Sequence, residues 1–330
     1  MKNPSSPTRR SLLAAATMLA AGFGHVAIAQ ENYPAKPVTL VVPFTPGGSN
    51  DVIARVIGQR LSQIWNQPVI VDNKTGAAGS IGTDHVAKAP ADGYKLLITN
   101  NNTMSINPVL LPNTPYVVAR DFAQVTQLGV VPVVLVVNAN VKATTVKELV
   151  DLAKAAPGKL TYASSGSGSP QHLSAELFKA MTGTDITHIP YKGAAPAITD
   201  MLAGQVDLQF GAINSLLPHI RTGKLRALAV GGTRRASLLA DVPTMAEAGL
   251  PQYDSEIWLG LAAPAGTPAV VIKRINEDVT KVLGEPAVKE KLAEQGIDAR
   301  PSTPREMTKL VEKDTARWAS VIKSAGIKAD

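Results

Sequence analysis

The fold is decided by the segment Val38-Thr39-Leu40-Val41-Val42-Pro43-Phe44-Thr45-Pro46-Gly47-Gly48-Ser49-Asn50-Asp51-Val52-Ile53-Ala54-Arg55. Its apolar, β-branched start predicts a buried strand, a Pro/Gly turn follows, and apolar residues at helical spacing come next. A helix that begins directly after a glycine pair exposes unpaired N–H groups at the positive end of its dipole. We therefore expect a loop that can hold an anion without a cationic side chain.

Strand-like and helix-like patterns alternate along the rest of the chain. The patterns predict strands over 38–42, 69–72, 96–99, 133–137, 160–163, 186–189, 206–210 and 225–230. They predict helices over 52–65, 80–89, 145–155, 172–182, 195–203, 270–283, 286–295 and 304–324. This order is typical of α/β domains with parallel sheets and helices on both faces. The almost wholly β-branched run 133–137 is expected to be buried on both faces.

The chain of 330 residues is long enough for two domains with separate cores. It divides where the run 133–137 ends and again in the loop-rich segment 243–258, after which we expect helices. We therefore predict two doubly wound α/β domains joined by a two-strand hinge, with a ligand cleft between them. The first would hold residues 30–137 plus 253–330, and the second residues 138–252.

The first 29 residues have the pattern of a secretory signal peptide. Three basic residues precede an apolar run over 12–21 that is too short to span a bilayer, and Ala27-Ile28-Ala29 provides a cleavage site. Thr8-Arg9-Arg10-Ser11-Leu12-Leu13 fits a twin-arginine export signal as well as a general secretory one. We expect cleavage after Ala29 and export of the mature protein from the cytoplasm.

Composition excludes several classes of function. Removal of the signal peptide lowers the formal net charge from +7 to +4, and the remaining basic residues form no runs, so nucleic acid is not an expected partner. The chain has no cysteine, which excludes thiol catalysis and thiolate metal sites. The five histidines are scattered without a zinc-binding pair, and we predict no metal and no cofactor.

Four loops share one character, in which a strand is followed by Gly, Ser or Pro and then by a helix start. They are 44–51, 76–82, 164–169 and 191–196, the last beginning at Tyr191. Ligands of open α/β sheets bind beyond the carboxyl ends of the strands. Any one of these loops is explained by a tight turn alone, but four in one chain favour a carboxylate site, to which the hydroxyls of Ser49, Ser80, Ser165 and Ser169 would add donors.

Some residues in or beside these loops can be interpreted either as functional or as purely structural. Phe44 either lines the cleft or fills the core, and Asp51 is expected to cap its own helix rather than touch an anion. His172 either orients the Ser/Gly loop by hydrogen bonding or merely starts a helix. The segment 76–82 lacks a P-loop lysine, and the segment 164–169 lacks a nucleophile elbow, so the chain has no catalytic motif.

The mature chain resembles the substrate-binding proteins of tripartite tricarboxylate transporters, the Bug-type receptors. The resemblance rests on the order of short motifs over residues 31–330. These are Tyr33-Pro34-Ala35-Lys36-Pro37, Val42-Pro43-Phe44-Thr45-Pro46-Gly47-Gly48, Ala87-Lys88-Ala89-Pro90-Ala91-Asp92-Gly93-Tyr94, Ile106-Asn107-Pro108, Tyr162-Ala163-Ser164-Ser165-Gly166, His172-Leu173, Pro190-Tyr191-Lys192-Gly193, Pro218-His219-Ile220, Leu225-Arg226-Ala227-Leu228-Ala229-Val230, Asp241-Val242-Pro243-Thr244 and Ala263-Pro264-Ala265-Gly266-Thr267-Pro268.

The resemblance implies a type II periplasmic binding protein fold that closes on a small carboxylate. It places ligand contacts at Phe44, Gly48, Ser49 and Asn50 in the first loop, at Thr103 after the third strand, and at Ser165, Gly166 and Ser169 in the second domain. Gly211-Ala212 stands where many relatives have Asp-Asn, and Met104 where a histidine is common. Both departures are expected to make the pocket more apolar and an amino-acid ligand less suitable.

We therefore expect a monomeric periplasmic receptor that captures an organic carboxylate, delivers it to transporter membrane subunits and performs no catalysis. The predicted ligand contacts also include Ser80, His172 and Tyr191. Two alternative functions remain open. The protein could be a ligand sensor for a membrane signalling partner, or a periplasmic hydrolase or isomerase that uses His172 or Ser165.

Overall fold

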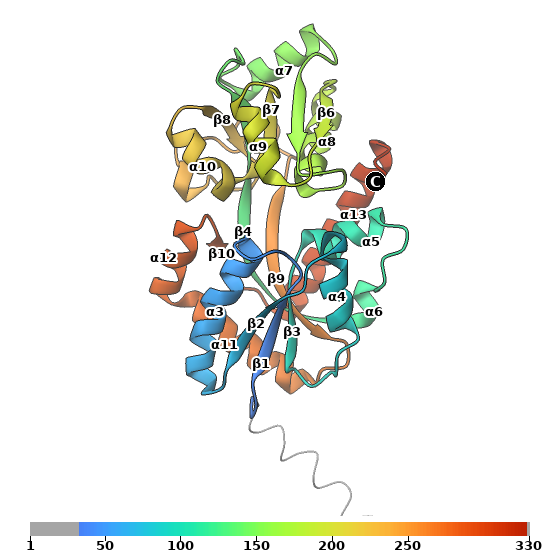
Figure 1. Ribbon diagram of the computed structural model, residues 1–330, viewed down its shortest axis with the longest axis vertical. Coiled ribbons are helices and arrows are strands. Elements are labelled where there is room, and N and C mark those ends of the chain that lie inside the picture. The colour runs from blue at the N-terminus through green and yellow to red at the C-terminus, as the bar shows by residue number, and fades with distance from the viewer. Residues whose placement is uncertain (1–32, 329–330) are drawn as a thin grey trace, which may run out of the picture.

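The computed structural model describes residues 33–328, which form a mixed α/β structure of two lobes (Figure 1). Residues 1–29, where we predict the signal peptide, lie outside the described part of the chain. Both lobes are built on β4 (Phe122–Asn138), a single strand whose two halves pair in two different sheets.

Lobe 1 contains the strand order β2-β1-β3-β9-β4, with β10 on the far side of β4. The bounds of the strands are β1 (Val38–Val42), β2 (Val69–Asn73), β3 (Lys95–Asn100), β9 (Glu256–Pro264) and β10 (Asp298–Ala299). The helical segments are α3 (Ser49–Trp65), η1 (Ala77–Gly79), α4 (Ser80–Ala87), η2 (Asn102–Ile106), α5 (Asn107–Leu110), α6 (Val118–Asp121), α11 (Ala269–Gly284), α12 (Pro286–Glu294) and α13 (Pro304–Ser324).

Lobe 2 contains the strand order β4-β7-β5-β6, and β8 pairs with the other edge of β4. Its strands are β5 (Thr161–Ser164), β6 (Thr187–Pro190), β7 (Leu208–Ala212) and β8 (Leu225–Val230). Its helical segments are α7 (Val146–Ala155), α8 (Pro170–Thr182), α9 (Ala194–Leu202), α10 (Ile213–Arg221) and η3 (Ser237–Leu239).

The partner of β4 changes between two consecutive residues. Pro132 pairs with Glu256 of β9 in lobe 1, and Val133 pairs with Ala212 of β7 in lobe 2. The chain returns to lobe 1 through the segment that leads into β9, so β4 and β9 lie where the two lobes join in Figure 1. A proline suits this position because it donates no ladder hydrogen bond.

Most predicted elements are confirmed to within three residues at each end. The segment 133–137 is also confirmed as buried, but it is only the lobe 2 half of a strand of 17 residues. The expectation of parallel sheets is right for β1–β2, β1–β3, β5–β6 and β5–β7 and wrong for every described pair that involves β4 or β9.

The expectation that helices dominate after residue 258 is confirmed by α11, α12 and α13, but β9 and the short β10 were not predicted, and neither was α10. The sequence of β9, Glu-Ile-Trp-Leu-Gly-Leu-Ala-Ala-Pro, has few residues that favour strands. Its two antiparallel neighbours, β3 and β4, supply the stabilising pairs. Tertiary pairing therefore overrides local preference here.

The apolar faces of the helices cover these sheets. Leu40, Ile53 and Ile98 are fully buried in lobe 1, and Tyr162 and Phe178 are fully buried in lobe 2. The C-terminal helix α13 also reaches lobe 2, because its buried Trp318 lies in one apolar cluster with Leu173 of α8. None of the helices within 33–328 is both long and apolar enough to cross a bilayer.

Leu135 offers a test of the importance of β4 for stability. Its side chain is fully buried in the lobe 2 half of the strand. We expect Leu135→Ala to lower the free energy of unfolding by about 2–5 kcal/mol, because it removes buried methyl groups and leaves a cavity. Urea denaturation measures the loss. Leu152→Ala on α7, where the side chain is 36% exposed, is the matched control and should cost less than about 1 kcal/mol. Equal losses would contradict the account.

Candidate functional site

A cavity of about 550 Å³ lies between the two lobes, a volume typical of small-molecule sites. All four predicted loops contribute to its wall. The lining residues are Phe44, Thr45, Gly48, Ser49, Asn50, Ala78, Asn100, Asn102, Asn107, Leu110, Leu111, Ser165, Ser167, Gly168, Ser169, Pro170, Gln171, Gly193, Ala194 and Ile257.

Asp51 holds the first loop in shape. Its carboxylate accepts hydrogen bonds from the Gly47 amide at 3.0 Å, from Asn73 Nδ2 at 3.0 Å and from both Nε and Nη2 of Arg55 at 2.9 Å. Asn73 Nδ2 also donates to the Phe44 carbonyl at 3.1 Å. Asp51 therefore braces the turn that precedes its helix and does not line the cavity. It lies in the first turn of α3, as expected, but its amide partner is Gly47, which precedes the helix, so the expected cap is not what it forms.

The pKa of Asp51 is lowered by these contacts. Burial alone would raise it, since desolvation disfavours the charged form. The hydrogen bonds from Arg55, from the Gly47 amide and from Asn73 outweigh this effect and bring the pKa below its ordinary value of 3.8. Asp51 is therefore a charged brace throughout the neutral pH range.

The start of α3 presents donors to the cavity. Gly48 occupies the N-cap and has no side chain to cap the helix, which leaves first-turn N–H groups available to an anion. Ser49 Oγ accepts a hydrogen bond from Asn214 Nδ2 of lobe 2 at 3.1 Å, so its own proton is free to donate elsewhere. Asn50 is held by Asn100 Nδ2 at 3.2 Å.

The loop before α8 forms the wall that belongs to lobe 2. Ser165 Oγ donates to Gln171 Oε1 at 3.0 Å, and both side chains line the cavity. Ser169 Oγ caps α8 by accepting from the His172 amide at 3.3 Å. The Gly168 amide donates to His172 Nδ1 at 2.9 Å, so this histidine orients the loop by hydrogen bonding.

Five predicted ligand residues are not on the cavity wall. In lobe 1, Ser80 is buried and accepts from Asn107 Nδ2 at 3.3 Å. Thr103 is fully buried, with its hydroxyl 2.7 Å from that of Thr99 and its amide bonded to Asn100 Oδ1. Both residues hold the lining loops from behind.

The other three belong to lobe 2 and are not among the lining residues. Gly166 exchanges hydrogen bonds with the Ser164 hydroxyl at 3.1 Å, and His172 is buried beneath the loop. Tyr191 donates its hydroxyl to Asp200 Oδ2 at 2.8 Å. Desolvation, together with this carboxylate acceptor, raises the pKa of Tyr191 to about 12, so the hydroxyl stays neutral and committed to Asp200.

Several lining residues were missed from the sequence. Asn102 and Asn107 each donate Nδ2 to the Ala78 carbonyl, at 2.9 and 3.0 Å, and so hold the second loop against the cavity. The run of three asparagines from Asn100, at the carboxyl end of β3, is a signal that could have identified Asn100 and Asn102, but it does not include Asn107. Ile257 was missed because β9 was not predicted.

The lining residues of this cavity include no Lys, Arg, Asp or Glu. Its polar groups are hydroxyls, side-chain amides and backbone groups, and its apolar ones are chiefly Phe44, Leu110, Leu111 and Ile257. Over residues 33–328 no group of three side chains is placed to bind a metal ion. The wall therefore combines uncharged hydrogen-bonding groups with apolar side chains.

The two departures from the family pattern do not reach this wall. Met104 is 1% exposed and packs in the core of lobe 1 against residues such as Phe122. Gly211 faces Leu216, and neither it nor Ala212 lines the cavity. The expectation that these substitutions make the pocket more apolar is therefore not supported by their positions.

Comparison with known proteins identifies the family. Residues 53–327 match the model of the tripartite tricarboxylate transporter family receptor. The chain is 40% identical over 302 residues to Protein BugT of Bordetella pertussis, an alignment that covers 91% of this chain and 93% of that protein. The chain belongs to the tripartite tricarboxylate transporter receptor family. Membership in this receptor family makes it a binding protein rather than an enzyme.

Solved structures that the chain resembles have the same fold. The R. palustris protein Rpa4515 with adipate is 40% identical, with a TM-score of 0.80 over 90% of this chain and 99% of that one. MatC from Rhodopseudomonas palustris with bound malate is 31% identical, with a TM-score of 0.75 over 88% of this chain and 100% of that one. The periplasmic binding protein fold implied by the resemblance is thereby confirmed.

Asp51→Asn tests the brace of the first loop. Because folding lowers the pKa of Asp51, its stabilisation is complete above the unfolded-state pKa and is lost as pH falls through the folded-state pKa. We expect the variant to lose about 1–3 kcal/mol of unfolding free energy at pH 7. The gap to wild type should shrink below about pH 4.

Urea denaturation at pH 7 and at pH 3 measures this gap. Asp151→Asn, which alters an exposed ion pair with Lys147 on α7, is the control and should change little at either pH. A gap for Asp51→Asn that is the same at both pH values would show that the charge of Asp51 is not what braces the loop.

Proposed function

We propose that this protein is a monomeric periplasmic receptor that captures a small organic carboxylate and delivers it to the membrane subunits of a tripartite tricarboxylate-type transporter. The observation that carries the proposal is the cavity between the lobes, whose neutral donors surround the start of α3. Membership in the receptor family supports the transport role.

We further propose that residues 30–137 plus 253–330 and residues 138–252 move as two domains. The ligand would bind while the cleft is open, and contacts from both lobes would then favour the closed state. The change of β4 from one sheet to the other supports a hinge at the crossing strands.

In this proposal Phe44, Gly48, Ser49 and Asn50 grip one carboxylate, and Ser165 and Ser169 act from lobe 2. All six line the cavity. The remaining predicted residues, Ser80, Thr103, Gly166, His172 and Tyr191, would shape the loops instead of touching the ligand.

The ligand class we propose is a short aliphatic dicarboxylate. Its carboxylates would take the polar loops of the two lobes, and its methylene chain would contact apolar residues such as Phe44 and Ile257. Two structures of relatives have such acids bound, adipate in one and malate in the other.

A thermal-shift screen of the mature protein tests the ligand class. A ligand that binds only the folded state adds about 2.7 kcal/mol of stability at 100 times its dissociation constant, so a C4–C6 dicarboxylate should raise the melting temperature by several degrees. The uncharged diamide of the same acid is the control and should have no effect. Stabilisation by sugars or peptides, with none by carboxylates, would contradict the proposal.

Ser49→Ala combined with Ser165→Ala tests the assigned contacts. Each substitution removes a protein hydroxyl that would bind the charged ligand. We therefore expect the double variant to lose at least about tenfold in affinity, measured by calorimetry. Ser62→Ala, on α3 but outside the cavity, is the control. Unchanged affinity of the double variant, with an unchanged melting temperature, would refute the contacts.

A further inference from the structure

A second cavity, of about 160 Å³, also lies between the lobes. Glu256 of β9 lines it, whereas the next residue, Ile257, lines the ligand cavity. Successive side chains of a strand point to opposite faces. The second cavity, which we call the rear cavity, therefore lies on the other face of the strand that joins the lobes.

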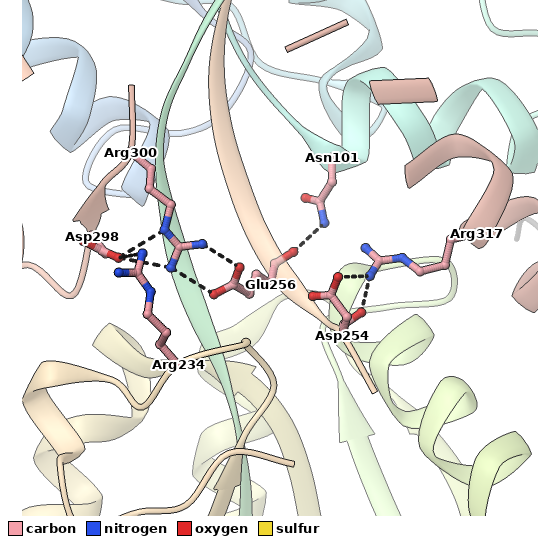
Figure 2. Close-up of polar contacts among 7 residues, drawn as sticks. All are labelled: Asn101, Arg234, Asp254, Glu256, Asp298, Arg300 and Arg317. Carbon is pink, nitrogen blue, oxygen red and sulfur yellow. Dashed lines mark hydrogen bonds and ion pairs between the residues drawn. The ribbon is translucent and has the colours of Figure 1, made fainter. Parts of the chain in front are cut away.

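An ion pair crosses the rear cavity from lobe to lobe (Figure 2). Arg234, in the loop after β8 of lobe 2, has Nη2 at 3.8 Å from Asp298 Oδ2 on β10 of lobe 1. Asp298 also pairs with Arg300 at 3.1 Å, and Arg300 pairs with Glu256 at 3.0 Å. Arg234 is thus the lobe 2 member of a network that otherwise belongs to lobe 1 and β9.

Residues 253–256, which lead into β9, connect the two lobes between the two cavities. Tyr253 donates its hydroxyl to the Ser174 carbonyl, and the Ser255 hydroxyl lies 2.5 Å from that of Ser174, so both bind α8 of lobe 2. Asp254 instead pairs at 3.2 Å with Arg317 of α13, the lobe 1 helix that also packs against α8.

Glu256, the next residue after Ser255, is tied to lobe 1. Its carbonyl accepts from Asn101 Nδ2, at the end of β3, at 3.2 Å (Figure 2). Neighbouring residues of the segment are therefore tied to opposite lobes. A rotation of the lobes must be absorbed here and at the other crossing, Pro132–Val133 of β4.

We propose that the rear cavity is a counter-interface, which narrows when the ligand cleft opens and widens when it closes. The Arg234–Asp298 pair then stabilises the open receptor and weakens ligand binding. The proposal rests on ligand capture by closure of the cleft. The two cavities lie on opposite faces of one joining strand. A rotation of the lobes about that strand therefore narrows one cavity as it widens the other.

The size of the effect follows from the exposure of the pair. The side chains of Arg234 and Asp298 are 69% and 54% exposed, so solvent screens their attraction. The apparent dissociation constant of a receptor that binds in its closed state varies inversely with the closed fraction. Repulsion in place of attraction should therefore tighten binding about two- to fivefold.

Two variants test the counter-interface by independent means. Arg234→Glu replaces attraction by repulsion across the rear cavity, and Asp298 keeps Arg300 as its partner. Ser237→Trp adds bulk at an exposed lining position and obstructs the narrowing of the rear cavity. Lys147→Glu is the matched control for charge, because it breaks an ion pair within lobe 2 alone.

The readout is the distance between spin labels on cysteines introduced at Thr75 and Ala195, exposed residues beside the ligand cavity on opposite lobes. The chain has no cysteine of its own, so labelling is specific. In the ligand-free protein, Arg234→Glu and Ser237→Trp should each shift the population toward shorter distances, and Lys147→Glu should not. Calorimetry with adipate should then show the two- to fivefold gain in affinity for these two variants only.

Each outcome bears on one proposal. Wild-type distances in both test variants, with a wild-type melting temperature, would overturn the counter-interface, and so would a gain in affinity without a shift in distance. If the distances shift but no carboxylate binds any variant or the wild type, the counter-interface stands and the proposed ligand class fails.

Discussion

The two lobes depend on one shared strand. β4 contributes its first half to the sheet of lobe 1 and its second half to that of lobe 2, and the change of partner takes place between Pro132 and Val133. The lobe 2 half is buried on both faces, so it cannot shift without loss of apolar burial. This constraint fixes β9 beside it, places the ligand cavity on one face of β9 and puts the rear cavity on the other.

The ligand cavity has no charged side chain among its lining residues. Its wall has polar but uncharged side chains, while the charged groups stand one layer behind, as Asp51 does beneath the first loop. A neutral wall of preformed donors avoids leaving an unpaired buried charge whenever the cleft is empty. The helix start can still stabilise an anion, because its N–H groups are fixed by the fold before the ligand arrives.

The sequence predicts most helices and strands and the loops around the cavity, because their local patterns of apolar residues and turn residues are strong. Periodicity and turn chemistry located the four loops that meet at the cavity. They also placed Asp51 in a first helical turn, but its bonds to Gly47 and Asn73 depend on how the loop packs and were not predicted. β9 could not be predicted, because Gly260 and the residues after it become a strand only through pairing on both sides. Without β9, the sequence did not identify Ile257 in the cleft or the antiparallel centre of the sheet. Ser80 and Thr103 have the right residue types for ligand contacts but face the protein, a distinction that only side-chain packing decides.

A crystal structure of the mature protein with the dicarboxylate that stabilises it most would test the central claim directly. The account predicts one carboxylate within hydrogen-bonding distance, about 2.7–3.2 Å, of first-turn amides of α3 and the Ser49 hydroxyl, with the second facing the loop before α8. It predicts no Lys or Arg side chain in contact with either. A carboxylate paired with an arginine or lysine, or a ligand outside the cavity between the lobes, would contradict it.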